Sequence, residues 1–250
     1  MSTQKESIHI LFYSLPMISF IPASSRGQAN HGWLQTAYSF SFSTYYDPTR
    51  MHFGVLRVLN DDIIAGDNGF PEHPHDNMEI ITIVLSGALE HKDDMGNGGV
   101  IRPGDVQVMS AGDGVHHSEF NPSPVEPVSL FQLWIYPHTQ NIPSRYDQAS
   151  FDWQNMKNDQ MTLVSSDNRP DTLLIHANAS VTMGVYEANQ KTTYVLNNAK
   201  YWVFLMCVEW SLEVDGHTLG RRDVLEITDM TEFGIKMITD GQWMAIEVEM

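Results

Sequence analysis

The sequence predicts an all-β protein made of two stacked barrels. Runs of strand length, apolar or alternating, recur along the chain, and Gly, Asn, Asp and Pro residues that favour turns separate them. The segment 103–106 (Pro-Gly-Asp-Val) has a counterpart at 219–224 (Leu-Gly-Arg-Arg-Asp-Val), which is a weak internal repeat. With 250 residues, of which 42% are hydrophobic, the chain can bury the cores of two such units.

The first half of the chain has the pattern of short strands and turns that is typical of a β-meander. Its expected strands are 38–42, 54–59, 79–85, 88–93, 106–110 and 128–136. Turn signals at 86–87, 95–99 and 111–114 separate the last four of these strands. Residues 137–160 have no clean period and several turn formers, so we expect them to connect the two halves, with room for a short helix.

The second half repeats this all-β style. Its expected strands are 172–176, 181–187, 193–196, 201–214, 224–227 and 234–238. His176 and His217 are the only histidines of residues 161–250, and no His-x-His occurs there. We therefore expect the second barrel to lack metal ligands and to serve as a packing partner.

Two pairs of residues in the first half suggest ligands gathered for one metal ion. In a strand, side chains at i and i+2 leave the same face, so His73 and His75 point together, as do His117 and Glu119. The turns between the pairs can fold one beside the other. Three imidazoles and a carboxylate suit Fe(II), Mn(II), Co(II), Ni(II), Cu(II) or Zn(II), and four protein ligands on an octahedral ion leave two open positions.

The histidines of the first half can also be interpreted without a metal ion. The two pairs could be polar residues in a wet barrel mouth. His116 has the opposite strand parity to His117 and is expected to face away. His91 lies in the mixed string Glu-His-Lys-Asp, which suits a solvated residue or one that supports a ligand from behind.

The same segments carry a family resemblance. His73-Pro74-His75, followed by Glu79, resembles the first motif of the cupin superfamily, and Gly104, Gly112, His117 and Asn121 resemble parts of the second. Together with the strings 26–34, 39–42, 90–93 and 103–112, they are similar to the pirin family of bicupins. The resemblance covers residues 18 to 250, strongly to Phe151. It implies two tandem cupin barrels of the jelly-roll type, with 18–136 binding the metal and 161–250 forming the second barrel.

The chain departs from the general cupin pattern in two places. Ser110 stands where the second motif usually has Pro, and seven residues rather than six separate Glu79 from Gly87. In most cupins a Glu placed like Glu79 is a ligand, whereas pirin-like proteins use the Glu two residues after the third His. The resemblance therefore assigns the metal to His73, His75, His117 and Glu119. Glu79 would point inward as a supporting acceptor or proton carrier if its strand were unbroken.

The resemblance also implies a function. Bacterial pirin-like proteins include quercetin 2,3-dioxygenases, which open the central ring of a flavonol with O₂ and release carbon monoxide. We accordingly expect a flavonol-like substrate, Fe(II) as the metal, and Glu119 as both ligand and catalytic base. The alternative is a metal-binding, redox-sensitive regulator that binds a transcription factor or an enzyme, because eukaryotic pirins are described as such co-regulators. An open cavity above the metal would favour catalysis.

Composition limits the partners. With 14 Lys and Arg against 31 Asp and Glu, the net charge of −17 disfavours nucleic acid and anionic membranes. The single cysteine, Cys207, excludes an intrachain disulfide and fits a cytoplasmic protein, for which we expect a monomer. Residues 1–17 precede the resemblance and are expected to form an extension, ordered or disordered. The apolar run 8–23 could suggest a secretory signal peptide, but Pro16 and Pro22 interrupt it, so none is expected.

Overall fold

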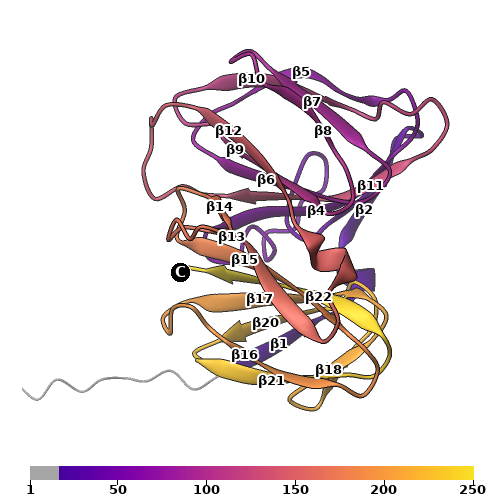
Figure 1. Ribbon diagram of the computed structural model, residues 1–250, viewed down its shortest axis with the longest axis vertical. Helices are drawn as coiled ribbons and strands as arrows, with labels where there is room; N and C mark the ends of the chain where they lie inside the picture. The colour runs from indigo at the N-terminus through magenta and orange to yellow at the C-terminus, as the bar shows by residue number, and fades with distance from the viewer. Residues whose placement is uncertain (1–16) are drawn as a thin grey trace, which may run out of the picture.

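The computed structural model describes residues 17–250, which form two barrels stacked on one another (Figure 1). The expected extension 1–17 lies outside the described residues except for Met17. Strands make up nearly all the regular structure, with two short 3₁₀ turns, η1 (Ala23–Ser25) and η2 (Asp152–Asn155). The prediction of an all-β chain with two barrels is confirmed.

The N-terminal barrel closes between a seven-stranded and a four-stranded antiparallel sheet. The larger sheet has the order β12 (Arg145–Ser150), β9 (Asp105–Ser110), β6 (Glu79–Ser86), β11 (Val128–Ile135), β4 (Leu56–Ile64), β3 (Leu34–Tyr38), β2 (Gly27–Asn30). The smaller sheet has the order β5 (Gly69–His75), β10 (Val115–Phe120), β7 (Leu89–Asp93), β8 (Gly98–Ile101).

The C-terminal barrel repeats this plan. Its larger sheet has the order β1 (Met17–Ile21), β20 (Val224–Thr228), β17 (Trp202–Glu209), β22 (Gly241–Val248), β15 (Ala179–Tyr186), β13 (Asp159–Ser165), β14 (Leu173–Leu174). The smaller sheet has the order β16 (Lys191–Val195), β21 (Glu232–Met237), β18 (Leu212–Val214), β19 (His217–Leu219). Figure 1 shows the two larger sheets back to back in the middle of the molecule.

Two strands lie in sheets that the expected boundaries do not assign to them. Strand β1 pairs with β20 of the C-terminal barrel, although the chain that follows it enters the N-terminal barrel. Strand β12 lies inside the expected connection 137–160, yet it pairs with β9 of the N-terminal barrel. The short helix allowed for in that connection is the 3₁₀ turn η2. Each strand covers an open sheet edge, which satisfies backbone groups that would otherwise face water.

The largest hydrophobic core lies between the two barrels. In β6, Ile81 and Ile83 belong to this core, whereas Ile80 packs inside the N-terminal barrel. In β17, Phe204 and Met206 point to the shared core while their neighbours point into the C-terminal barrel. The central strands of both larger sheets, such as β6, β17 and β22, are therefore buried on two faces, as their nearly continuous apolar runs require.

The interiors of the two barrels differ in polarity. The C-terminal interior is an apolar cluster that includes Val203, Leu205 and Trp243. In the N-terminal barrel a cross-strand row of polar side chains crosses the larger sheet. Its buried members are Asn60, Gln132, Thr82 and Gln107, each directly opposite the next. The C-terminal interior also holds a buried carboxylate, Glu247, but it is hydrogen-bonded by Tyr194 and Asn197, whereas the side chains of Thr82 and Gln107 in the N-terminal row make no well-formed hydrogen bond among residues 17–250.

Several strand predictions need correction. Strand β3 ends at Tyr38, where the expected strand 38–42 begins, and β4 continues to Ile64 instead of ending at residue 59. The expected strand 201–214 breaks at Trp210, whose φ of 70° is a left-handed conformation that a strand cannot contain. Strands β13 and β22 were not predicted. Strand β13 has no long alternation of apolar and polar residues, and strand β22 begins with Gly and Gln.

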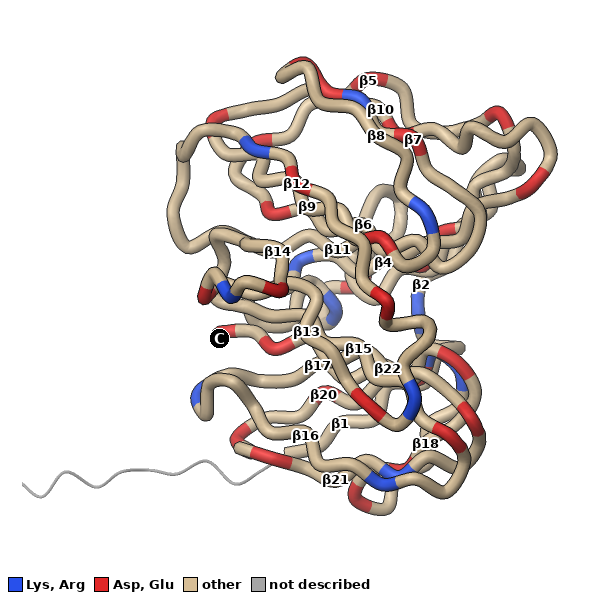
Figure 2. Tube along the Cα trace, in the orientation of Figure 1, with Lys and Arg blue, Asp and Glu red and all other residues tan. Residues whose placement is uncertain are grey.

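Acidic side chains are spread over both barrels and outnumber basic ones, as Figure 2 shows. Among the described residues, no helix is long and apolar enough to cross a membrane.

Candidate metal centre

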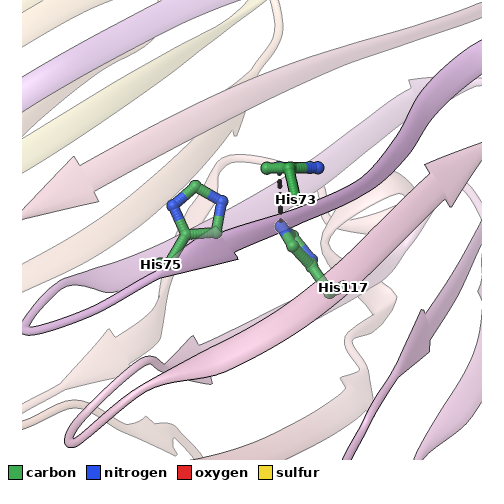
Figure 3. Close-up of side chains that lie close together, drawn as sticks. All are labelled: His73, His75 and His117. Atoms are coloured by element: carbon green, nitrogen blue, oxygen red, sulfur yellow. Dashed lines mark hydrogen bonds between the residues drawn. The ribbon is translucent and has the colours of Figure 1, made fainter.

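Three histidines meet on the inner face of the smaller sheet of the N-terminal barrel. His73 and His75 lie two residues apart on β5, and His117 of β10 is directly opposite His73 in the antiparallel register. Figure 3 shows the three imidazoles gathered above these two strands. Strand alternation and strand pairing together bring about this grouping.

One ring nitrogen from each of these three residues lies within 4.8 Å of one from each of the others. His117 Nε2 is 3.1 Å from His73 Nε2, and the ring centroid of His75 lies 4.8 Å from each of the other two. We call His73, His75 and His117 the three-histidine cluster. Imidazole nitrogens at this spacing can share one cation after small rotations of the side chains.

The hydrogen bonding of His73 leaves a nitrogen free for ligation. Its Nδ1 lies 2.8 Å from the carbonyl oxygen of Pro71, which can only accept, so Nδ1 carries the proton. In the neutral ring, Nε2 then carries no proton, and its lone pair points at His117 Nε2. A backbone acceptor behind a ligating histidine is the usual arrangement in metal sites.

Burial keeps the cluster in its neutral, ligand-ready form. It lowers the pKa of His75 to about 4, with the neighbouring His73 adding to the effect. Burial likewise lowers the pKa of His117 to about 2, with further contributions from His73, His75 and His91. Protons therefore do not compete with a metal ion for these two rings near neutral pH.

Glu119 lies next to the cluster but outside it. A β-bulge between His117 and Glu119 shifts the register, so Glu119 pairs with Phe70 where an unbroken ladder would give Pro71. Its Oε2 accepts a hydrogen bond from Gln132 Nε2 at 2.9 Å, and its buried Oε1 has no partner among residues 17–250. Burial raises the pKa of Glu119 to about 7. The structure thus brings three of the four predicted ligands together and places the fourth beside them.

His91 contacts the three-histidine cluster through His117. It is fully buried opposite Glu119, and together with His117 and Glu119 it forms a second group of ligand-type atoms within 4.8 Å. Its Nδ1 is 3.4 Å from Nδ1 of His117, and its Nε2 is 3.3 Å from Oδ2 of Asp93. The solvated interpretation of His91 is therefore wrong, because its side chain is buried beside His117 and Glu119.

Two other residues show where strand parity holds and where it breaks. His116 is exposed, which confirms that it faces away from His117. Glu79 was expected to point inward on a continuous strand, but β5 ends at His75 and β6 begins in the other sheet after a turn at Asn77 (φ 46°). Glu79 therefore lies on the side of Ile81, toward the other barrel, where it accepts a hydrogen bond from Ser110 Oγ at 2.8 Å.

A cavity of about 460 Å³ opens beside the three-histidine cluster. It lies between the two sheets of the barrel, and His73, His75 and Glu119 form part of its wall. The rest of the exposed lining surface is mainly apolar, and Leu34, Phe42, Phe70 and Trp134 contribute to it. The Trp134 ring stands edge-on to His75, with 4.9 Å between the centroids. This volume is in the ~300–1,000 Å³ range of small-molecule sites.

Some residues of the site were not predicted from the sequence. Gln132 holds Glu119, and Thr36, Asn60 and Asp62 line the cavity wall opposite the histidines. The available signal was the alternation of β4, where Val58, Asn60, Asp62 and Ile64 share one face. Asn60 and Asp62 are residue types that favour turns, and they obscured this alternation.

Comparison with known proteins places this chain in a family. Residues 20–135 match the family described as Pirin, and residues 162–248 match the quercetinase C-terminal cupin domain. The quercetin 2,3-dioxygenase of Escherichia coli strain K12 is 38% identical over 93% of this chain and 99% of its own length. This chain belongs to the pirin family. The resemblance seen in the sequence and the bicupin fold are both confirmed.

Other members agree in sequence and structure. A pirin-like protein of Caulobacter vibrioides is 39% identical over 92% of this chain and 99% of its own length. The crystal structure of the bacterial pirin YhhW of Escherichia coli in complex with nickel(II) is 35% identical, covers 93% of this chain and 99% of that one, and gives a TM-score of 0.88. The present pirin therefore has relatives named as dioxygenases and one solved with a metal, and its own His and Glu groups could hold a divalent metal ion.

Proposed function

We propose that this pirin is a metal-dependent dioxygenase that opens flavonols such as quercetin with O₂. The observation that carries the proposal is the three-histidine cluster at the wall of a mainly apolar cavity of about 460 Å³. An apolar cavity of this size suits a flat aromatic molecule, and polar ligand atoms at one wall suit its oxygen-bearing edge. Relatives named quercetin 2,3-dioxygenase support the choice of substrate class.

The residues present fit a divalent transition metal. In this proposal His73, His75 and His117 hold the ion, Glu119 is the fourth ligand, and Fe(II) is the native metal. Mn(II), Co(II), Ni(II), Cu(II) and Zn(II) suit the same donor set. Both the free Nε2 of His73 and the unpartnered Oε1 of Glu119 are explained by ligation. When bound, the metal supplies Lewis acidity and redox chemistry.

The protein groups have separate tasks in this scheme. Glu119 alternates between two roles, ligand and base: as the base it accepts the proton of the flavonol 3-hydroxyl on Oε1, while Gln132 keeps Oε2 in place. Phe70 and Trp134 flank the aromatic rings and exclude water from the reacting edge. His91 Nδ1 accepts a hydrogen bond from Nδ1–H of His117, which leaves His117 Nε2 for the metal and fixes the orientation of that ring.

The overall reaction consumes one O₂ for each flavonol. Both atoms of O₂ enter the opened product, and C3 leaves with its own oxygen as carbon monoxide. The proton taken up by Glu119 returns to the carboxyl group formed on ring opening. No other oxidant or reductant is needed.

The test is an oxygen-electrode assay of metal-free protein reloaded in turn with each of the six metals. With quercetin, at least one metal form should consume O₂, release carbon monoxide and bleach the long-wavelength absorption band of the flavonol. If no metal form does so, the dioxygenase proposal is wrong.

The regulatory alternative remains a second candidate because the net charge of −17 suits a basic protein partner. The cavity beside the cluster favours catalysis, since a surface that only signals the redox state of a metal needs no space for a substrate. Protein that binds metal but neither binds nor turns over quercetin would favour the regulator.

A further inference from the structure

A row of polar side chains faces the three-histidine cluster across the cavity. Thr36 of β3 lies directly opposite Asp62 of β4, and Asn60 follows two residues away on the same face. All three line the cavity from the larger sheet, whereas the histidines line it from the smaller sheet. We call Thr36, Asn60 and Asp62 the acceptor row.

The acceptor row is buried and incompletely hydrogen-bonded. Thr36 is 6% exposed, Asn60 3% and Asp62 2%. Asn60 Oδ1 has no hydrogen-bond partner among residues 17–250, and Thr36 Oγ1 and Asp62 Oδ1 make no well-formed hydrogen bond there, although the two side chains lie close enough for Thr36 to lower the pKa of Asp62. Buried oxygen atoms without well-formed hydrogen bonds cost free energy, so a cavity that keeps three of them side by side calls for a ligand that satisfies them.

The fold itself does not require polar residues at such positions. In the C-terminal barrel the interior faces of β17 and β22 carry apolar residues such as Leu205 and Ala245, and the buried Glu247 of β22 is hydrogen-bonded by Tyr194 and Asn197. That barrel closes well without an equivalent of the acceptor row. The polar character of the row therefore belongs to the cavity rather than to barrel architecture.

The chemistry of these atoms defines the ligand group. Carboxylate and amide oxygens accept hydrogen bonds, and a threonine hydroxyl can accept as well as donate. A matching ligand must bring donors on an otherwise flat, apolar body, because Leu34 and Phe42 lie beside the row in the cavity wall. Phenolic hydroxyl groups on an aromatic ring meet both requirements.

We propose that Thr36, Asn60 and Asp62 form a subsite that binds ring hydroxyl groups of an aromatic substrate whose opposite edge lies at the three-histidine cluster. The inference rests on the proposed function and deepens it, since it makes the number of ring hydroxyls a determinant of specificity. A site built to bond a hydroxyl rejects an analogue that lacks it, because its own polar groups are then left unpaired.

The experiment compares two flavonols with the nickel(II)-loaded protein under nitrogen, so that binding is measured without turnover. Quercetin carries hydroxyls on both outer aromatic rings, and 3-hydroxyflavone carries none there. Quenching of tryptophan fluorescence gives the Kd of each. The wild type should bind quercetin about 10-fold more tightly than 3-hydroxyflavone.

Two variants remove acceptors in different ways. Thr36→Val keeps the shape of the side chain and should weaken quercetin binding about 3-fold, and Asp62→Leu should weaken it about 10-fold. Neither should change the Kd of 3-hydroxyflavone. Thr228→Val is the matched control, because Thr228 is also 6% exposed with an unpartnered hydroxyl but lies in the C-terminal barrel.

The outcomes separate the subsite from the proposed function. Equal affinity of the wild type for both flavonols, or equal effects of Thr36→Val on both, would overturn the subsite and leave flavonol binding intact. Binding of neither flavonol to the wild type would overturn the proposed function and the subsite with it.

Discussion

His75 and His116 lie on paired strands and face opposite sides of the smaller sheet. His75 belongs to the three-histidine cluster, and His116 is exposed next to Asp94. We predict that His75→Ala weakens metal binding more than about 10-fold, because a ligand contributes at least as much as the residues behind it. His116→Ala should retain the wild-type metal content. Elemental analysis after gel filtration measures both, and equal retention by the two variants would refute the ligand set.

Asp62 makes stability depend on pH. Burial raises its pKa to about 7 in the folded protein, with smaller contributions from the carboxylates of Asp61 and Glu119. The ordinary value is 3.8, so the folded state binds the proton more tightly than the unfolded chain does. The stabilisation by this proton is complete below pH ~4 and is lost as the pH rises through ~7.

We therefore predict that Asp62→Asn, which cannot ionise, loses less stability than the wild type between pH 5 and pH 8. Between pH 5 and the folded-state pKa of about 7, about two pH units contribute, which is on the order of 3 kcal/mol. Urea unfolding of metal-free protein at both pH values measures it. Parallel pH profiles for the two proteins would show that Asp62 keeps an ordinary pKa.

The residues of the site differ in how far the sequence could predict them. Strand parity was enough for His73, His75 and His117, because both strands are regular up to His117. It was not enough for Glu119, since the bulge that displaces it depends on how β10 pairs with β5. The prediction that Glu79 points inward was wrong for a related reason, because the turn before Glu79 moves the chain to another sheet.

At the scale of elements, strand β4 has two faces with different tasks. One face gives Asn60 and Asp62 to the cavity, and the other places Asp61 against the C-terminal barrel. Arg222 Nε donates to Asp61 Oδ2 at 2.7 Å, and its guanidinium lies 4.7 Å from the ring centroid of Phe131. The barrels are thus joined by a buried ion pair as well as by their apolar core.

We predict that Arg222→Met lowers the free energy of unfolding by about 3 kcal/mol, because it removes the 2.7 Å partner of the largely buried Asp61 and leaves Arg26, at 3.5 Å, as its remaining ion pair among residues 17–250. The matched control is Arg169→Met, since Arg169 pairs with Asp167 at 2.6 Å but its side chain is 38% exposed and that of Asp167 51%. That change should cost less than about 1 kcal/mol. Denaturant unfolding compares them, and similar small losses in both would contradict a structural role for the buried pair.

The same strand shows why element boundaries were only partly predictable. Asn60, Asp61 and Asp62 are residue types that favour turns, so the expected strand stopped at residue 59. In the fold, the cavity on one side and Arg222 on the other give these side chains partners or space, and the strand continues. Tertiary contacts decide such cases, and local sequence does not contain them.

At the scale of the whole molecule, the two barrels depend on each other. Strand β1 closes the edge of the C-terminal barrel, and the largest core lies between the barrels. The pairing of β1 with β20 joins segments about 200 residues apart, which no local pattern predicts. The two-barrel architecture, by contrast, was predictable because turn signals and strand-length runs repeat along the whole chain.

We predict that the metal-free protein unfolds in one cooperative transition. Circular dichroism and tryptophan fluorescence should give coincident curves in guanidinium chloride. The isolated segment 161–250 should be aggregated or should bind a hydrophobic dye, because it lacks β1 and exposes its half of the shared core. Two separated transitions, or a soluble and cooperatively folded segment 161–250, would show that the barrels are independent.

The most direct test of the account is anomalous X-ray diffraction from crystals of the nickel(II)-loaded protein, recorded at the nickel absorption edge. We predict one strong peak within ~2.0–2.2 Å of a ring nitrogen of His73, His75 and His117, with a Glu119 oxygen as a further ligand. No peak between these histidines, or a peak held by other side chains, would contradict the claim that they form a metal centre.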